Sequence, residues 1–513
     1  MRTQEAELAV VGSGICGLLT AWGALNAGRS VVMLERGGLK THAEQLADRT
    51  YTTDAPGARP NHQTAPGTPD YRWSYVYGVG GSSLHWSGNT PRLSAADFEM
   101  RSRYGVMVDW PLRYDELLPY YLRAEDALGV AGAPTAPAGT RPAGPPVPGT
   151  RSLPAHPLSP MDRAVMDRLR PFGPLPQARP SRPLGDRPAC CGSATCELCP
   201  VDSRFSALNG LRPVLDHPGL SLRTETVAAR LRLAGGGRRV ESIEALRPDG
   251  ERFSVRAQTF VLAAGGFENP ALLLRSGLER PATGRYLFDH AHTTVTVRLR
   301  RSVDPGVGSS LATGLSNAFR EGAFRSRRSS AIASPYIPGA PIGELAADAY
   351  EQGHSGDELR REVRERWRHS VPFDVLTEDV PRPERRVTLS PDKGELGLPL
   401  LRIHYPPPSR YERDGIDATV RGIERRLAPL GVTAVDARPG PAGAHLLGTC
   451  RMGSGDEGVV DADMRHLDVE NLYVAGGSAF PTYSPAHPTL TIAALAIRLG
   501  DHLAREGHAA RRR

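Results

Sequence analysis

The chain has 513 residues, 40% hydrophobic and 23% charged, which is ordinary for a soluble globular protein with two or more domains. Its formal net charge is +7, and nearly all of its basic residues are arginines, because only Lys40 and Lys393 are lysines. The sequence contains no basic stripe with interleaved aromatic residues, so we expect no nucleic-acid partner. No apolar run is long enough to cross a membrane, and the first such run leads straight into glycines. We therefore expect no membrane insertion and no signal peptide, and a cytoplasmic location.

The first clear unit is a strand, a helix and a second strand. Residues 7–11 form an apolar run that predicts a buried strand, and residues 18–27 predict a helix that ends at Gly28. Residues 30–35 predict the next strand, which ends in an acidic residue. This succession is typical of the first half of a dinucleotide-binding fold.

The glycine turn G-x-G-x-x-G lies between the first strand and the helix. We expect Gly12 to make the turn, Gly14 to let the backbone approach a pyrophosphate, and Gly17 to let the helix pack on the strand. Glu35, at the end of the second strand, is placed to accept hydrogen bonds from ribose hydroxyls. The motif alone does not separate FAD from NAD.

A second glycine-rich segment contains Gly80, Gly81 and Ser82. Glycines followed by hydroxyl groups suit a backbone that cradles a phosphate or the edge of a flavin. His85 and Trp86 are its unusual members. The simpler alternative is a glycine-rich loop that is packed by an aromatic side chain.

Residues 131–188 are rich in Pro, Gly, Ala and Arg, and only residues 160–169 carry a helical pattern. We predict a long, partly extended surface excursion that could act as a lid or an interface arm.

Four of the six cysteines follow this excursion, at Cys190, Cys191, Cys196 and Cys199. Clustered thiols in a reducing compartment favour a metal or an iron–sulfur cluster over disulfides, and Cys-x-x-Cys-Pro resembles iron–sulfur spacing. Zinc would also accept four thiolates, but two adjacent cysteines could hardly both bind it without strain. Unliganded loop cysteines or one disulfide are the other interpretations.

Residues 222–233 and 242–246 predict strands that return to the nucleotide fold. Residues 259–266 predict a buried strand that ends on glycines, and a helix is expected to start at Asn269. This ending would bring another backbone segment onto a cofactor.

Residues 285–435 lack glycine fingerprints and predict an inserted α+β domain. Strands are expected at residues 293–300, 386–389 and 400–405, and helical pieces at residues 343–370. Such an insertion would cover the reactive end of the cofactor.

The C-terminal stretch contains His445 and His487, 42 positions apart. His487, Pro488 and Thr489 read as a helix start, because proline is favoured in the first helical turn. Residues 490–497 are apolar enough to form a largely buried helix. Two histidines and a helix N-terminus suit a reaction in which a proton leaves and anionic charge develops.

These motifs together resemble the glucose–methanol–choline (GMC) flavoprotein oxidoreductases along nearly the whole chain. The matching segments follow the family's order: the Gly12–Gly17 turn with Glu35; Gly80-Gly81-Ser82; Val261-Leu-Ala-Ala-Gly-Gly-Phe-Glu-Asn-Pro270; His445-Leu-Leu-Gly-Thr-Cys-Arg-Met-Gly453; Val459-Val-Asp461 with Glu470-Asn-Leu-Tyr-Val-Ala-Gly-Gly-Ser478; and His487-Pro488-Thr489. The resemblance implies FAD and the GMC fold, an α/β plus α+β architecture with a discontinuous Rossmann-like FAD-binding domain and a sheet-based substrate-binding domain.

The resemblance also divides the chain. Residues 1–130, 201–284 and 436–513 are expected to form the three parts of the FAD-binding domain. Residues 131–200 would be the excursion with the cysteines, and residues 285–435 the substrate-binding domain.

The resemblance implies roles for individual residues. His445 would remove the proton of a substrate hydroxyl while hydride leaves the same carbon for flavin N5, and His487 would hydrogen-bond the developing alkoxide. FAD contacts are expected at Gly12, Gly14, Gly17, Glu35, Arg36, Gly80, Gly81, Ser82, His85, Val227, Gly477, Pro488 and Thr489.

Two features resemble particular branches of the family. The His85-Trp86 pair is similar to the branch of sugar and gluconate dehydrogenases and pyranose oxidases, and in pyranose oxidases the matching histidine carries FAD covalently. The cysteine run resembles the iron–sulfur segment of membrane-linked glucose and gluconate dehydrogenases, but Cys196-x-x-Cys199 is one residue shorter.

The branch favours a sugar, aminosugar or other polyhydroxylated small molecule, with O2 or another electron acceptor. The composition resembles that of actinomycete proteins, in which GMC enzymes act in aminoglycoside biosynthesis. A cationic substrate would need acids, for which Asp374, Glu378 and Asp379 are candidates, although a solvated acidic loop is the simpler interpretation. The alternatives are an iron–sulfur dehydrogenase subunit that passes electrons to a protein partner, and a GMC-fold lyase with non-redox FAD.

Overall fold

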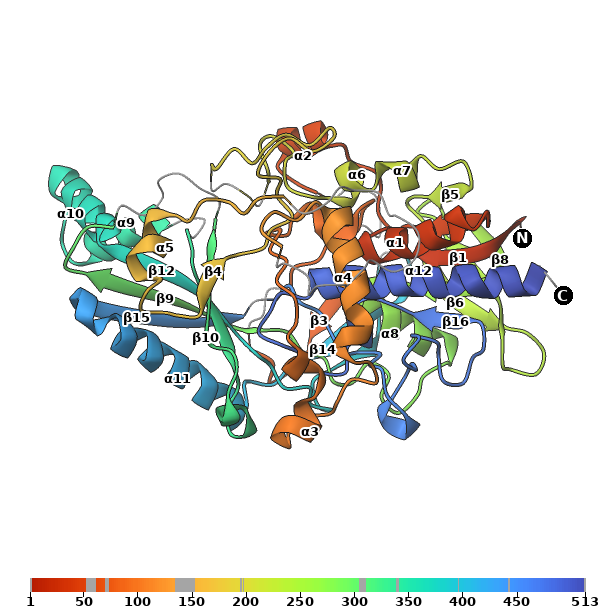
Figure 1. Ribbon diagram of the computed structural model, residues 1–513. Helices are drawn as coiled ribbons and strands as arrows, with labels where there is room; N and C mark the ends of the chain where they lie inside the picture. Colours follow the sequence, from red (N-terminus) through yellow and green to blue (C-terminus); the bar gives the residue numbers. More distant parts are fainter. Residues whose placement is uncertain are drawn as a thin grey trace.

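The computed structural model describes residues 2–51, 61–69, 73–133, 153–193, 196, 198–303, 311–337, 341–394, 396–441 and 443–511. Figure 1 shows two halves, each built around its own sheet, with the long C-terminal helix α12 (Thr489–Arg511) along the half that holds the N-terminus. The most N-terminal and most C-terminal elements therefore lie side by side.

The first sheet has the order β5-β2-β1-β8-β7-β6, and β16 pairs with β8. Its strands are β1 (Arg2–Val11), β2 (Val31–Leu34), β5 (Leu220–Arg223), β6 (Val227–Leu233), β7 (Val240–Leu246), β8 (Arg252–Leu262) and β16 (Leu472–Val474). The central strands are parallel, whereas β6 and β7 run antiparallel to their neighbours. Parallel strands that are buried on both faces have unbroken apolar sequences, so the strands of this half can be predicted from the sequence.

Helices α1 (Ile15–Asn26) and α12 pack closely because both carry a glycine at their contact. A Cβ placed on Gly23 would lie 2.4 Å from the carbonyl carbon of Gly500. Helix α1 begins at Ile15, inside the glycine motif and three residues before the predicted start. Likewise, α8 (Gly265–Ser276) begins before the predicted start at Asn269.

Helix α4 (Tyr114–Leu128) packs on α12 and was not predicted. The Tyr121 hydroxyl lies 2.7 Å from the Thr491 Oγ1. The shorter helices are α2 (His42–Asp48), α3 (Met100–Tyr104), α5 (Pro160–Val165), α6 (Ala207–Gly210) and α7 (Arg212–Leu215).

The second sheet is antiparallel, with the order β15-β9-β12-β11-β10-β4. Its strands are β4 (Phe172–Pro174), β9 (Ala291–Leu299), β10 (Gly314–Phe319), β11 (Ala331–Pro335), β12 (Ser370–Thr377) and β15 (Val432–Pro441). Helix α11 (Arg410–Leu427) was not predicted; it lies beside this sheet in Figure 1 and buries Ile423 and Leu427 in the sheet's core. Helices α9 (Pro341–Glu351) and α10 (Gly356–Arg368) are the predicted helical pieces.

A small third sheet joins β13 (Arg386–Lys393), β14 (Pro399–His404) and β3 (His62–Thr64). Residues 134–152 of the predicted excursion lie outside the described residues. The part that follows is no surface excursion, because Met161, Val165 and Leu169 are buried in the core of the second sheet and β4 forms its edge. Among the described residues, no helix is both long and apolar enough to cross a membrane.

Candidate active site

A cavity of about 1710 Å³ lies between the two halves. The glycine turns line one end, and side chains from β9 and β12 line the other. Small-molecule pockets usually measure roughly 300–1,000 Å³, so this cavity has room for a dinucleotide and a further ligand.

The glycine turns meet at the cavity, where Gly14 and Gly80 form an isolated bridge. Gly12 has a φ of +99°, and a Cβ there would lie 2.6 Å from the Ala263 carbonyl oxygen. At Gly14 a Cβ would meet no atom closer than 3.9 Å and would only take up cavity space. Gly17 does not line the cavity; a Cβ there would lie 2.0 Å from the Gly12 carbonyl oxygen, so this glycine serves packing.

Glu35 lies at the cavity just after β2, and its carboxylate is held by the chain itself. One oxygen accepts hydrogen bonds from the Ser13 amide and hydroxyl, at 3.0 and 2.7 Å. The other accepts from the amides of Gly37 and Gly78, at 2.9 and 3.1 Å. These donors fix the carboxylate where an acceptor for ribose hydroxyls was predicted.

The remaining predicted cofactor contacts also line the cavity. Arg36 does so while its guanidinium pairs with Glu268 at 2.7 Å and stacks on Tyr77. The others are Gly81, Ser82, His85, Val227, Gly477, Pro488 and Thr489.

His85 carries a buried Nε2 that has no hydrogen-bond partner among the described residues. Its Nδ1 lies 3.4 Å from the Ser74 hydroxyl, and burial lowers the pKa of the ring to about 4. A neutral imidazole with an unpartnered buried nitrogen is suited to contact a ligand. Trp86 also lines the cavity, and its indole N–H donates to the Phe205 carbonyl at 2.7 Å.

His445 and His487 both line the cavity and lie side by side. Their ring centroids are 5.6 Å apart and the rings are nearly perpendicular. Burial lowers the pKa of His445 to about 3 and that of His487 to about 4. Both rings are therefore neutral at physiological pH and able to take a proton.

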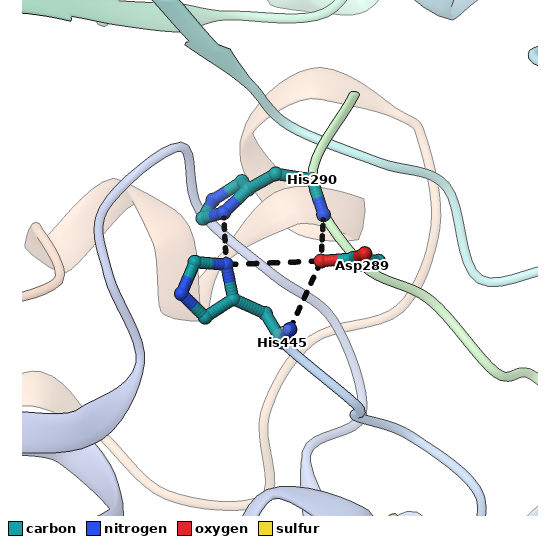
Figure 2. Close-up of side chains that lie close together, drawn as sticks. All are labelled: Asp289, His290 and His445. Carbon is teal, nitrogen blue, oxygen red and sulfur yellow. Dashed lines mark hydrogen bonds and ion pairs between the residues drawn. The ribbon is translucent and has the colours of Figure 1, made fainter. Parts of the chain in front are cut away.

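Figure 2 shows two residues that the sequence interpretation missed, Asp289 and His290, against His445. Nδ1 of His290 lies 2.8 Å from Nδ1 of His445, and Nε2 of His290 lies 3.0 Å from the Ser484 carbonyl oxygen. Asp289 accepts from the amides of His290 and His445, at 2.7 and 3.1 Å, and from the Gly443 amide. Burial raises the pKa of Asp289 to about 7.

His487 is held by a second chain of polar groups. The Asn89 amide nitrogen lies 3.4 Å from Nε2 of His487, and the Asn89 oxygen accepts from the Arg179 guanidinium at 3.3 Å. Since arginine can only donate, the Asn89 nitrogen must face His487, whose Nε2 then accepts. Nδ1 of His487 is buried and without a partner among the described residues.

Of the three candidate acids, only Asp374 lines the cavity. Its Oδ1 lies 2.8 Å from Nε2 of His292, which also lines the cavity. Burial works to raise the pKa of Asp374, but the hydrogen bond and charge of His292 lower it below the ordinary value. Glu378 and Asp379 are instead buried in ion pairs with Arg325 and Arg385, so neither a solvated loop nor a substrate contact describes them.

Residues 175–292 and 381–496 match the GMC oxidoreductase family. The chain is 31% identical to 6'''-hydroxyparomomycin C oxidase of Streptomyces lividus, over 97% of this chain and 92% of that protein. The chain belongs to the GMC oxidoreductase family. It is also 30% identical to the fructose dehydrogenase large subunit of Gluconobacter japonicus, over 97% of this chain and 98% of that protein.

The fold of this GMC oxidoreductase is also similar to a solved structure. A pyridoxine 4-oxidase from Mesorbium loti superimposes with a TM-score of 0.67 at 20% identity, covering 98% of this chain and 99% of the other. The predicted α/β plus α+β GMC fold is thus confirmed. The protein is an FAD-dependent oxidoreductase that acts on the CH–OH group of small molecules, with O2 or another electron acceptor.

An iron–sulfur cluster in this GMC oxidoreductase is not supported. Cys191 is exposed and Cys190 half-buried, whereas Cys196 and Cys199 are buried. The Arg179 guanidinium approaches the Cys196 sulfur at 3.0 Å. Within the described part of the chain, no three of these sulfurs come within 4.8 Å of one another, so the cysteines do not form a compact ligand set.

Proposed function

We propose that the protein oxidises a hydroxyl group of a sugar or aminosugar, with His445 as the base. The observation that carries this proposal is a pair of neutral histidines, His487 buried and His445 half-buried, that lie side by side in a cavity whose other end is built from glycine turns. The cytoplasmic location expected from the sequence belongs to the same proposal.

FAD fits the glycine end of the cavity. The facing turns at Gly12, Gly14 and Gly80 would hold the pyrophosphate, and Glu35 the ribose. His85, whose buried Nε2 has no partner among the described residues, is placed to contact the flavin. Thr489, the first residue of α12, also lines the cavity, so the helix N-terminus lies at the cavity wall. When bound, FAD accepts the hydride from the substrate carbon.

The histidines have complementary roles in this proposal. His445 takes the proton of the substrate hydroxyl, so that the carbon–oxygen double bond can form as hydride leaves the same carbon. His487 accepts from Asn89 at Nε2 and so carries its proton on Nδ1, which is free to donate to the substrate oxygen. One ring removes a proton while the other stabilises the resulting negative charge.

Asp374 supports an aminosugar as the substrate. Its carboxylate lies on β12 at the antiparallel-sheet end of the cavity and is placed to bind an ammonium group. A relative named for 6'''-hydroxyparomomycin C and another named for fructose agree with a polyhydroxylated substrate, charged or neutral.

Anaerobic bleaching of the bound flavin tests the proposal. We expect rapid reduction by glucosamine or paromamine, slower reduction by glucose or fructose, and none by benzyl alcohol. Glucose and glucosamine form a matched pair that differs by one ammonium group. Absence of bleaching by any sugar or aminosugar would exclude the proposed oxidation and favour a non-redox lyase.

The Asp374→Asn variant tests the ammonium site. It keeps the shape and removes the charge, so we expect the apparent Kd for glucosamine to rise by roughly 10-fold or more, with that for glucose nearly unchanged. Equal changes for the two sugars would show that Asp374 does not recognise the amine.

A further inference from the structure

His290 lies behind His445, completely buried, and does not line the cavity. Its two ring nitrogens have different partners. Nε2 faces the Ser484 carbonyl oxygen at 3.0 Å, whereas Nδ1 faces Nδ1 of His445 at 2.8 Å and, more distantly, the Tyr483 hydroxyl at 3.5 Å. His290 therefore contacts His445 (Figure 2) but not the cavity.

The Ser484 carbonyl determines where the proton of His290 lies. A carbonyl oxygen only accepts, so Nε2 of His290 must carry a hydrogen. Burial and the neighbouring His445 and His487 hold the pKa of His290 well below its ordinary value, so the ring is neutral and has only this one N–H. Nδ1 of His290 is consequently an acceptor.

The nitrogen that faces an acceptor must donate, which places the proton of neutral His445 on Nδ1. We propose that His290 is a positioning residue that fixes the tautomer of His445 and leaves the lone pair on Nε2, the nitrogen that takes the substrate proton. This inference rests on the proposed function, in which His445 is the base.

The backbone holds the two rings in register. Phe288 and Leu447 exchange amide-to-carbonyl hydrogen bonds of 3.2 and 3.1 Å, and the Asp289 carboxylate accepts from the amides of both His290 and His445.

A metal ion shared by the two rings fits less well. Two nitrogens about 2.0–2.1 Å from one tetrahedral ion would lie roughly 3.3 Å apart, farther than the 2.8 Å between these atoms.

The holoenzyme allows a direct test without substitution. Ring nitrogen NMR of the ¹⁵N-histidine-labelled, FAD-loaded protein, with His445 assigned by its loss in His445→Ala, should show Nδ1 protonated and Nε2 unprotonated. A proton on Nε2 of His445 would overturn the proposal.

Two substitutions of His290 separate hydrogen bonding from packing. His290→Phe keeps a ring but removes the acceptor, whereas His290→Asn offers a side-chain oxygen near the position of Nδ1. With the fastest-reducing alcohol of the panel above, we expect the rate constant of anaerobic flavin reduction to fall roughly 100-fold or more in the Phe variant, with an unchanged Kd for the alcohol. The Asn variant should stay within about 10-fold of the wild type, because it keeps an acceptor for the N–H of His445 although it loses the bond to Ser484.

The outcomes distinguish this inference from the function on which it rests. Wild-type rates in the Phe variant, or equal losses in both variants, would overturn the role of His290. If His445→Ala reduced as fast as the wild type, the proposed function itself would fail. If the Phe variant did not retain FAD, the NMR measurement on the wild type would decide.

Discussion

Burial keeps the rings of His445 and His487 neutral. A histidine in water is half protonated near pH 6.5, whereas these rings sit in an environment that disfavours the charged form. Each is further restricted by partners on its far side, His290 for His445 and Asn89 for His487. In the tautomers that we propose, one ring presents an acceptor and the other a donor to the same part of the cavity.

The pH dependence of flavin reduction tests this state of His445. Because the neutral ring is the reactive form, the rate constant falls only as the pH approaches the pKa of His445, which burial lowers to about 3. Asp289, whose pKa is raised to about 7 and whose carboxylate lies 3.7 Å from Nδ1 of His445, also titrates in this range, so the measurement uses the Asp289→Asn variant. In that variant we expect a flat profile from about pH 8 to about pH 5, measured by anaerobic stopped-flow spectroscopy. An inflection near pH 6.5 would mean that His445 titrates as an exposed histidine does.

At the scale of elements, the glycines of the turn before α1 have different tasks, one in packing and one beside the expected cofactor site. Gly17 is needed for packing, since a Cβ would lie 2.0 Å from the Gly12 carbonyl oxygen. Gly14 has an ordinary φ of −69° and open space on its side-chain face. We therefore expect alanine to impair folding at one of these positions and cofactor binding at the other.

We expect Gly17→Ala to destabilise the apoprotein by about 1–3 kcal/mol, through overpacking of helix against turn. Gly14→Ala should leave apoprotein stability unchanged but weaken FAD binding by at least about 10-fold, because the methyl group takes pyrophosphate space. Thermal melting of the apoproteins and fluorescence titration with FAD measure both effects. Gly235→Ala, at an open position, is the control.

Elements with unbroken apolar runs or glycine punctuation were predictable, and β1, α1 and β2 are the clearest cases. Helix α11 carried a readable signal that was overlooked, a Ser409 and Glu412 capping box ahead of apolar residues at helical spacing. Helix α4 contains an internal proline and only a small excess of apolar residues, so its local sequence does not predict a helix. Packing against the rest of the protein stabilises it.

The place of His445 and His487 in the cavity could be predicted because each stands in a motif. His290 lies in no motif, so its place in the site could not be predicted from the sequence. The pairing of Phe288 with Leu447 brings it against His445. The iron–sulfur interpretation is not supported, because spacing along the chain does not show whether sulfurs converge in space.

At the scale of the whole molecule, a buried ion network joins the two halves. Asp97, next to Phe98 in the core of the first half, pairs at 2.9 Å with Arg325, which also binds Glu378 at the end of β12 at 2.6 Å. All three side chains are fully buried. The network therefore ties the two halves of the molecule together.

We expect Arg325→Met to destabilise the protein by about 3–5 kcal/mol, because it leaves two buried carboxylates without their shared cation. Urea unfolding of the holoenzyme would measure the loss. Arg360→Met, which removes an exposed ion pair with Asp357 on α10, should unfold like the wild type. Equal stability of both variants would show that the network does not hold the halves together.

Anaerobic flavin reduction by the best sugar substrate, compared between wild type and His445→Ala, tests the central claim most directly. His404→Ala is a suitable control, because His404 lies on β14 and does not line the cavity. If His445 removes the substrate proton, the rate constant should fall by about 10²–10⁴-fold in His445→Ala with FAD still bound, and remain unchanged in the control. An alanine variant that reduces its flavin as fast as the wild type would contradict the account.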